Sequence, residues 1–180
     1  MSFSTSVTEV MPTTLSPQGV DLEQVCQQFG TPLYLYDADI VIRQIEALKN
    51  AFTYPKTKFK YAAKALTNIS ILKLIRQQEI DLDVVSIQEG HIALKAGFTP
   101  EQIMYTPSGV PFAEIDEAIE LGFQMNVDSL PLLRYIGERY GNTVPCCLRL
   151  NPDIRAGGHA KISVGHNESK FGIALSQLDL

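Results

Sequence analysis

Apolar positions along the chain follow two alternating periods, and this alternation predicts a repeating strand and helix unit. Short apolar runs that are typical of strands begin near Phe59, Asp81, Gln102, Phe123 and Val144. Between them, apolar residues recur at the three- and four-residue spacing of amphipathic helices. The helices predicted in this way cover residues 69–77, 89–95, 111–121 and 130–140. Strands that alternate with helices indicate an α/β fold with a parallel sheet.

The first part of the chain departs from this repeat. Asp21 is typical of a helix N-cap and predicts a short helix that runs to Gln28 and ends at Gly30. Residues 31–36 have the composition of a strand, and Asp37 is placed to cap a second helix. We therefore divide the chain into an N-terminal segment, residues 1–36, and a strand–helix repeat, residues 37–180.

Two architectures fit the repeat, a doubly wound open sheet and an eight-stranded (β/α) barrel. The open sheet predicts a glycine-rich phosphate turn after its first strand, but residues 63–68 contain no glycine. The barrel is therefore favoured. Because a complete barrel needs eight strands and about 250 residues, we expect the chain to hold only five to six of the eight units and to be the N-terminal part of a longer protein.

Charge and composition argue against several classes of partner. The formal net charge is −5 and the basic residues are scattered, which argues against binding to nucleic acid or to an anionic membrane surface. No apolar run approaches the roughly 20 residues of a membrane span, and the start lacks a signal peptide, so the cytoplasm is the expected location. Cys26, Cys146 and Cys147 have neither disulfide nor metal-ligand spacing and are predicted to be buried free thiols.

Chemistry in barrels of this kind lies at the C-terminal ends of the strands. Lys64 closes the first strand of the repeat beside small residues. An amine there suits a Schiff base if apolar surroundings or a nearby charge lower its pKa from about 10.4. The alternative is a lysine that extends to solvent. Asp83, on the second strand, is a candidate to hold a lysine or a cofactor group, or to form a structural ion pair.

Arg149 stands among apolar neighbours on the fifth strand. A buried guanidinium is costly unless an anion or acceptor meets it, so Arg149 needs a partner, either Asp83 or a ligand. The loop that follows is long for a strand–helix connection and contains His159 and His166, which are candidate proton donors or ligands, or plain solvated loop residues.

Together these segments resemble the fold type III pyridoxal-phosphate decarboxylases, the group that contains the diaminopimelate, ornithine and arginine decarboxylases. Residues 61–66, Tyr-Ala-Ala-Lys-Ala-Leu, look like the cofactor-lysine signature of the family. Residues 83–86 with Glu89 resemble its second-strand motif, and Arg149 matches its fifth-strand arginine. The resemblance implies that pyridoxal 5'-phosphate is the cofactor, that Lys64 binds it covalently, and that Asp83 and Arg149 contact it.

Within this group, residues 157–173 look most like the diaminopimelate decarboxylases. The resemblance then implies decarboxylation of meso-2,6-diaminopimelate to L-lysine by a homodimer, with the strand at residues 31–36 in a separate β-domain and further site residues beyond Leu180. A piece of this length is expected to be inactive alone. The alternatives are decarboxylation of ornithine, arginine or carboxynorspermidine, racemisation on the same barrel, or a non-catalytic carrier of pyridoxal phosphate.

Overall fold

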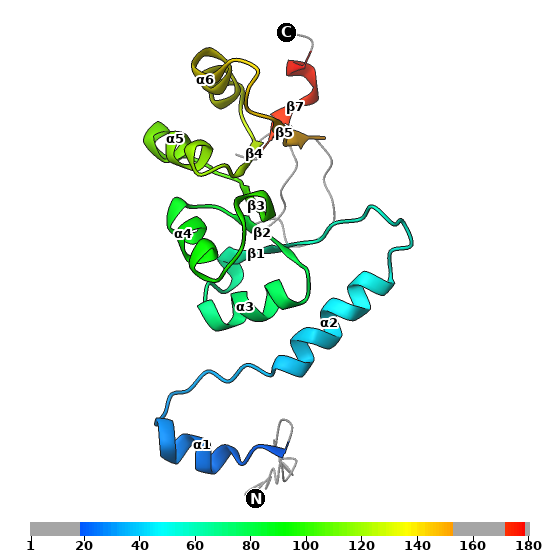
Figure 1. The fold of residues 1–180 in the computed structure, drawn as a ribbon, viewed down its shortest axis with the longest axis vertical. Coiled ribbons are helices and arrows are strands. Elements are labelled where there is room, and N and C mark those ends of the chain that lie inside the picture. Colours follow the sequence, from blue (N-terminus) through cyan, green and yellow to red (C-terminus); the bar gives the residue numbers. More distant parts are fainter. Residues whose placement is uncertain (1–18, 153–171, 179–180) are drawn as a thin grey trace, which may run out of the picture. The chain divides into compact units, whose positions relative to one another are not determined.

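The chain divides into two compact units, residues 1–51 and 52–180. The computed structural model describes residues 19–152 and 172–178 (Figure 1).

The described residues of the first unit form two helices, α1 (Leu22–Phe29) and α2 (Ala38–Asn50). The side chain of Asp21 accepts hydrogen bonds from two backbone N–H groups in the first turn of α1, at 2.9 and 3.2 Å. Asp37 caps α2 in the same way, at 2.9 and 3.1 Å. Both predicted caps are confirmed, and α1 ends before Gly30 as expected.

The segment between these helices is not the predicted strand. Residues 31–37 have no regular secondary structure and pair with no strand among the described residues. Four apolar or aromatic side chains in this segment are exposed: Leu33, Tyr34, Leu35 and Tyr36. A strand is stable only when a neighbour takes up its backbone hydrogen bonds, and the described part of this unit offers no such neighbour.

The second unit is built on a parallel sheet of five strands in the order β1-β2-β3-β4-β5 (Figure 1). The strands are β1 (Lys60–Ala62), β2 (Asp81–Val84), β3 (Ile103–Tyr105), β4 (Gln124–Val127) and β5 (Cys146–Leu148). The strand order follows the chain order, as right-handed strand–helix–strand units produce in a barrel. The prediction of a parallel α/β sheet is confirmed.

Four helices connect these strands: α3 (Ile69–Gln77), α4 (Ile87–Lys95), α5 (Phe112–Glu120) and α6 (Leu130–Tyr140). They agree with the predicted helices, and Gly97, Gly122 and Gly141 follow three of them with φ of 95°, 82° and 61°. The described part of this unit also contains three 3-10 turns: η2 (Ala63–Ala65), η3 (Pro100–Gln102) and η4 (Leu175–Gln177). Within residues 19–152 and 172–178, no helix is long and apolar enough to cross a membrane.

The strand that contains β5 continues past Arg149, and a sixth strand pairs with this continuation. Strands β6 (Leu150–Asn151) and β7 (Ile173–Ala174) pair in parallel. Arg149 joins them to the main sheet, because its N–H donates to the Val127 carbonyl at 2.8 Å and its own carbonyl accepts from Ile173 N–H at 2.8 Å. The start of a sixth unit is therefore confirmed.

The two faces of the main sheet differ in polarity. One face is covered by helices, since α4 contacts β2 and β3 and α6 contacts β4. Its side chains are at most 1% exposed: Leu82, Val84, Ile103, Tyr105, Met125 and Val127. Burial of each large apolar side chain contributes about 1.5–3 kcal/mol. Because successive residues of a strand point to opposite faces, the other face carries Lys60, Asp81, Asp83, Gln124 and Asn126, and we call it the polar face.

One buried phenol ties the sheet to two helices. Tyr105, on the helix-covered face of β3, donates a hydrogen bond to the Glu114 carboxylate of α5 at 3.4 Å. The same carboxylate accepts from the N–H of Ile87 at the start of α4 at 3.5 Å. Burial, together with the charge of Glu114, raises the pKa of Tyr105, so the phenol stays a donor. These contacts hold the C-terminal ends of β2 and β3 in place relative to the helices that follow.

Gly90 of α4 lies against the sheet with no room for a side chain. A Cβ there would stand 2.5 Å from Cε2 of Phe123, a ring that is 5% exposed. We expect Gly90→Ala to lower the free energy of unfolding by about 1–3 kcal/mol, because the buried ring must shift. Gly137→Ala in α6 is the matched control, since its Cβ meets nothing within 4 Å. Urea denaturation measures both variants, and equal midpoints would contradict the packing described here.

Candidate functional site

Lys64 lies in the turn η2, directly after the C-terminal end of β1. Its side chain is exposed, whereas the preceding Ala63 is fully buried. The sequence predicted apolar surroundings for the lysine, and this prediction is wrong among the described residues. The 3-10 turn buries the side chain of Ala63 and leaves that of Lys64 exposed to solvent. Lys64 has neither a hydrogen-bond partner nor an ion-pair partner among the described residues. Its amine is thus available to a ligand.

The backbone around Lys64 is fixed on both sides. The hydroxyl of Tyr61 donates to the carbonyl of Leu66 at 3.3 Å and so spans the turn. Leu66 N–H in turn donates to the carbonyl of Ala63 at 3.0 Å. Two residues later, the side chain of Asn68 caps α3 by accepting from the N–H of Ser70 at 2.9 Å and that of Ile71 at 3.3 Å. The reactive candidate therefore sits on a short, pinned connection between a strand and a helix.

Asp83 occupies the neighbouring strand on the polar face, in register with Ala62 of β1. Its Oδ1 accepts a hydrogen bond from the hydroxyl of Thr106, which follows β3. The side-chain amide of Asn126 on β4 donates to the same hydroxyl oxygen at 3.2 Å. Asp83 forms no ion pair among the described residues. The ion pair on this face joins Lys60 to Asp81 instead, at 3.5 Å.

The chain immediately after β2 is also held by hydrogen bonds. The carboxylate of Glu89 accepts from Val85 N–H at 2.8 Å, and the hydroxyl of Ser86 accepts from Glu89 N–H at 3.3 Å. The Ser86 bond caps α4, and the Glu89 carboxylate holds the backbone just before that cap. These two bonds give a structural reason for a glutamate three residues after Ser86, and they fix the backbone two residues after Asp83.

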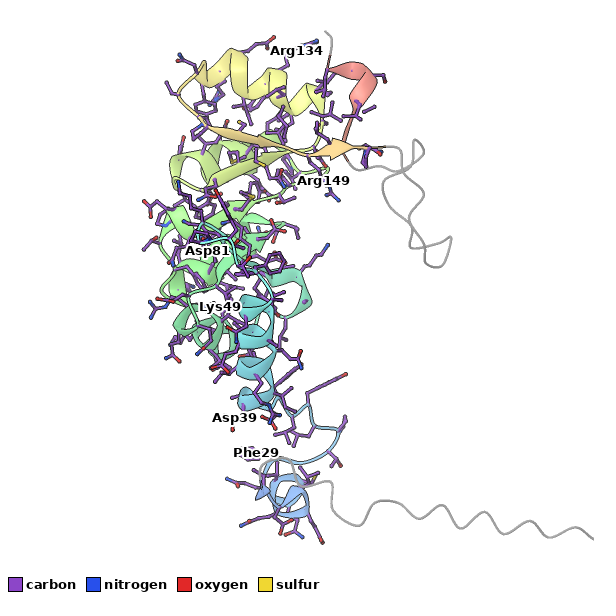
Figure 2. All side chains as sticks on the ribbon, turned by 90° about the vertical axis from the view of Figure 1, so that its right-hand side faces the viewer. Phe29, Asp39, Lys49, Asp81, Arg134 and Arg149 are labelled. Atoms are coloured by element: carbon purple, nitrogen blue, oxygen red, sulfur yellow. The ribbon has the colours of Figure 1, made fainter. Side chains whose placement is uncertain are left out.

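Arg149 lies between β5 and β6 (Figure 2). Strand alternation places its side chain on the same face as Cys147, which is in register with Asn126 on the polar face. Arg149 is half-buried and not fully buried as the sequence predicted. The backbone bonds of Arg149 continue the sheet, so the residue has a structural role as well as a candidate binding role.

The three cysteines are free thiols among the described residues, as predicted, but they are not buried. Cys147 is exposed, while Cys26 and Cys146 are half-buried. Cys26 lies on α1, a helix with no buried residue, and Cys147 lies on the polar face near the last strands of the sheet. Apolar composition alone did not reveal that these positions lack a covering layer.

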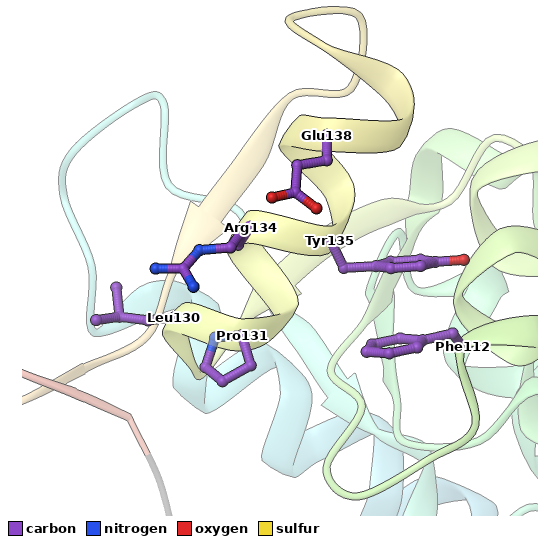
Figure 3. A pocket seen from close by; sticks show the side chains of 6 residues that line it. All are labelled: Phe112, Leu130, Pro131, Arg134, Tyr135 and Glu138. Carbon is purple, nitrogen blue, oxygen red and sulfur yellow. The ribbon is translucent and has the colours of Figure 1, made fainter.

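A cavity of about 300 Å³ lies along the helices and away from the candidate residues (Figure 3). The rings of Phe112 and Tyr135 stack at its side, 3.9 Å between centroids and 7° between planes. The remaining lining residues are Leu130, Pro131, Arg134 and Glu138. None of Lys64, Asp83 and Arg149 contributes to this cavity, so it is separate from the polar face.

Sequence reasoning missed two residues that the fold brings to Asp83. Thr106 directly follows β3, and Asn126 is the third residue of β4. Parallel strands that are buried on both faces have continuous apolar sequences. Polar residues at alternate positions of these strands therefore indicate a polar face, and this signal could have identified Thr106 and Asn126. His159 and His166, named as candidates from the sequence, lie outside the described residues.

Comparison with known proteins supplies the chemistry that fits this arrangement. The family profile described as "Pyridoxal-dependent decarboxylase, pyridoxal binding domain" matches residues 38–180. The chain belongs to this family. The family membership confirms the predicted pyridoxal cofactor, and the family match begins at the first residue of α2.

Individual relatives agree with the family. The diaminopimelate decarboxylase of Aquifex aeolicus is 35% identical over 164 residues, and that of Staphylococcus aureus is 37% identical over 166 residues. In both comparisons the match covers 89% of this chain and 39% of the relative. The crystal structure of diaminopimelate decarboxylase from Helicobacter pylori complexed with L-lysine superposes with a TM-score of 0.79 at 37% identity, covering 86% of this chain and 40% of that one. The chain thus spans about two fifths of the length of these relatives.

These likenesses confirm the predicted fold class. The five-stranded parallel sheet and its helices correspond to part of a pyridoxal-dependent decarboxylase barrel, and the chain covers that barrel incompletely. The roles of Lys64, Asp83 and Arg149 remain predictions.

The bond from Tyr61 to the Leu66 carbonyl provides a test of the turn that carries Lys64. We expect Tyr61→Phe to lower the free energy of unfolding by about 1 kcal/mol, since a half-buried acceptor loses its donor. Tyr54→Phe is the control, because Tyr54 is 66% exposed. Thermal or urea unfolding of both variants measures the difference. If the two variants lose the same stability, the phenol does not hold the turn.

Proposed function

We propose that the protein decarboxylates an amino acid with pyridoxal 5'-phosphate, that Lys64 is the catalytic residue that binds the cofactor, and that meso-2,6-diaminopimelate is the substrate. The products would be L-lysine and carbon dioxide. The observation that carries the proposal is the position of the Lys64 amine. It has no partner among the described residues and follows the C-terminal end of β1. The neighbouring strand β2 carries Asp83 in register with Ala62.

The residues of the polar face suit this cofactor. Lys64 Nζ would hold the cofactor through a C=N bond to its aldehyde carbon, with the aldehyde oxygen released as water. When bound, the cofactor supplies the electron sink for loss of carbon dioxide. The protein's contribution is to place the amine, to orient polar groups around it and to exclude water.

Asp83 and Arg149 bring opposite charges to the same face. The Asp83 carboxylate would orient the lysine and a polar group of the cofactor, and it is well placed for this because strand β2 adjoins the strand that leads to Lys64. The Arg149 guanidinium would contribute a polar contact near the cofactor from the far side of β4. Such groups act through fixed orientation, which costs no rearrangement when charge develops.

The substrate, the assembly and the location are parts of the same proposal. The Aquifex and Staphylococcus relatives are diaminopimelate decarboxylases, which supports diaminopimelate over ornithine, arginine or carboxynorspermidine. A homodimer in the cytoplasm is proposed for the protein that the complete gene encodes. Residues 1–36 would join a later β-domain, where the exposed segment at residues 31–36 would pair with a strand, as it does with none of the described residues.

Covalent attachment is tested by trapping the lysine-bound cofactor. The protein expressed from its complete gene is mixed with pyridoxal phosphate, reduced with borohydride, digested and analysed by mass spectrometry. We expect the added mass on the peptide that contains Lys64, and we expect Lys64→Ala to lose it. Lys73→Ala, which alters an exposed lysine of α3, should retain it. Trapping on another lysine, or equal trapping in Lys64→Ala, would contradict the assignment.

Substrate choice is tested separately, by measuring carbon dioxide release from several amino acids. We expect the kcat/KM for meso-2,6-diaminopimelate to exceed the values for ornithine and arginine by at least about a hundredfold, a difference of about 2.7 kcal/mol in transition-state binding. A higher value for ornithine or arginine would reject diaminopimelate and keep the cofactor assignment. Release from none of them would reject the decarboxylase.

A further inference from the structure

Three polar side chains form a hydrogen-bonded series across neighbouring strands of the polar face. Thr106 donates to Asp83, and Asn126 donates to Thr106. We propose that Thr106 and Asn126 are positioning residues that hold one oxygen of the Asp83 carboxylate and leave the other oxygen directed to the cofactor site beside Lys64. This inference rests on the proposed function, and it gives a role to two residues that the resemblance to the family did not identify.

Strand register brings the three residues together. Asp83 is in register with Met104 on β3, and Thr106 is two residues further along, on the same face. Met104 is in register with Gln124 on β4, and Asn126 is again two residues further along. Each residue therefore stands at or just past the C-terminal end of its strand, with Thr106 and Asn126 level with each other and two residues beyond the level of Asp83. These ends form the rim at which barrels of this kind carry their chemistry.

The carboxylate sets the direction of every bond in the series. An ionised Asp83 can only accept, so the Thr106 hydroxyl must donate its single proton to it. The hydroxyl oxygen then has lone pairs left, which the Asn126 amide N–H group fills at 3.2 Å. This fixes the orientation of the amide, because its nitrogen must face Thr106. Hydrogen bonds in such a chain polarise and strengthen one another. The bond from Thr106 to Asp83 is therefore stronger with Asn126 present than it would be without Asn126.

Burial indicates that these groups are retained for a purpose beyond packing. Thr106 is 8% exposed. The Oδ1 atom of Asn126 is buried and has no hydrogen-bond partner among the described residues. A buried acceptor without a donor costs free energy, whereas an apolar residue of the same shape would not. Asn126 therefore lowers the stability of the fold, and its amide group donates a hydrogen bond to Thr106.

The position of the series relative to Lys64 gives it a function. Ala62 and Asp83 are in register, and Lys64 follows Ala62 by two residues. With Oδ1 of Asp83 engaged by Thr106, the second carboxylate oxygen is the one left for an amine or a cofactor group on the β1 side. Without Thr106, the carboxylate could rotate and its charge would be spread over several orientations.

The test measures cofactor affinity in the protein expressed from its complete gene. Pyridoxal phosphate is titrated into the cofactor-free form and its binding followed by absorbance, for wild type, Thr106→Val, Thr106→Ser and Asn126→Leu. We expect Thr106→Val to weaken binding about tenfold, because a hydrogen bond to a charged group is lost. Thr106→Ser keeps the hydroxyl and should remain within about twofold of wild type. Asn126→Leu should weaken binding by a smaller factor.

A double-mutant cycle separates positioning from a general structural effect. If Thr106 acts through Asp83, then Thr106→Val adds nothing in an Asp83→Asn background. Thr143→Val is the matched control, since its hydroxyl also donates to one acceptor, the Tyr140 carbonyl at 2.7 Å. Thr143 lies in the turn before the N-terminal end of β5, and the rim is at the C-terminal ends of the strands. Thr143→Val should leave cofactor affinity unchanged.

Two results would overturn the inference while leaving the proposed function intact. One is a Thr106→Val protein that binds pyridoxal phosphate as tightly as Thr143→Val. The other is a pair of effects for Thr106→Val and Asp83→Asn that multiply in the double variant, since independent residues behave in that way. If Thr106→Val does not fold, Asn126→Leu is measured in the wild-type and the Asp83→Asn proteins instead. Effects that multiply in that double variant would overturn the inference in the same way. A wild-type protein that binds no cofactor would instead overturn the proposed function and the inference with it.

Discussion

The alternation of side chains along five parallel strands is the constraint on which this structure depends. One set of alternate residues is removed from water beneath α4 and α6, and it includes Leu82, Ile103 and Met125. Their burial fixes the register, because a slip by one residue would exchange the buried set with the charged one. The opposite set is then free of the packing requirement and can carry polar groups. The apolar face thus determines where Asp83 and its partners lie.

Register also turns residues distant in sequence into neighbours at one rim. Asp83, Thr106 and Asn126 come from three strand–helix units, yet hydrogen bonds connect them because register brings the C-terminal ends of their strands side by side. Side-chain hydrogen bonds to the backbone hold the connections just beyond the strands. Tyr61 makes such a bond across the turn of Lys64, and Glu89 makes one at the start of α4. Rigid strands with pinned ends are the kind of support that a precise binding site requires.

The sequence predicted most of the secondary structure because that information is local. Helical and strand periods, the caps Asp21 and Asp37 and the position of Lys64 after a strand can all be read within a short window. The missed features depend on partners far away. Whether residues 31–36 form a strand, or whether Cys147 is covered, depends on which other segment lies beside them. The contact of Thr106 with Asp83 depends on register across 23 residues, which composition does not reveal.

A crystal structure of the protein encoded by the complete gene, grown with pyridoxal phosphate, tests the central claim most directly. The account predicts continuous electron density from Nζ of Lys64 into the cofactor, with the Asp83 carboxylate on the same face and its Oδ1 still bonded to Thr106. Density for the cofactor on the helix-covered face, or attached to a lysine away from the end of β1, would contradict it.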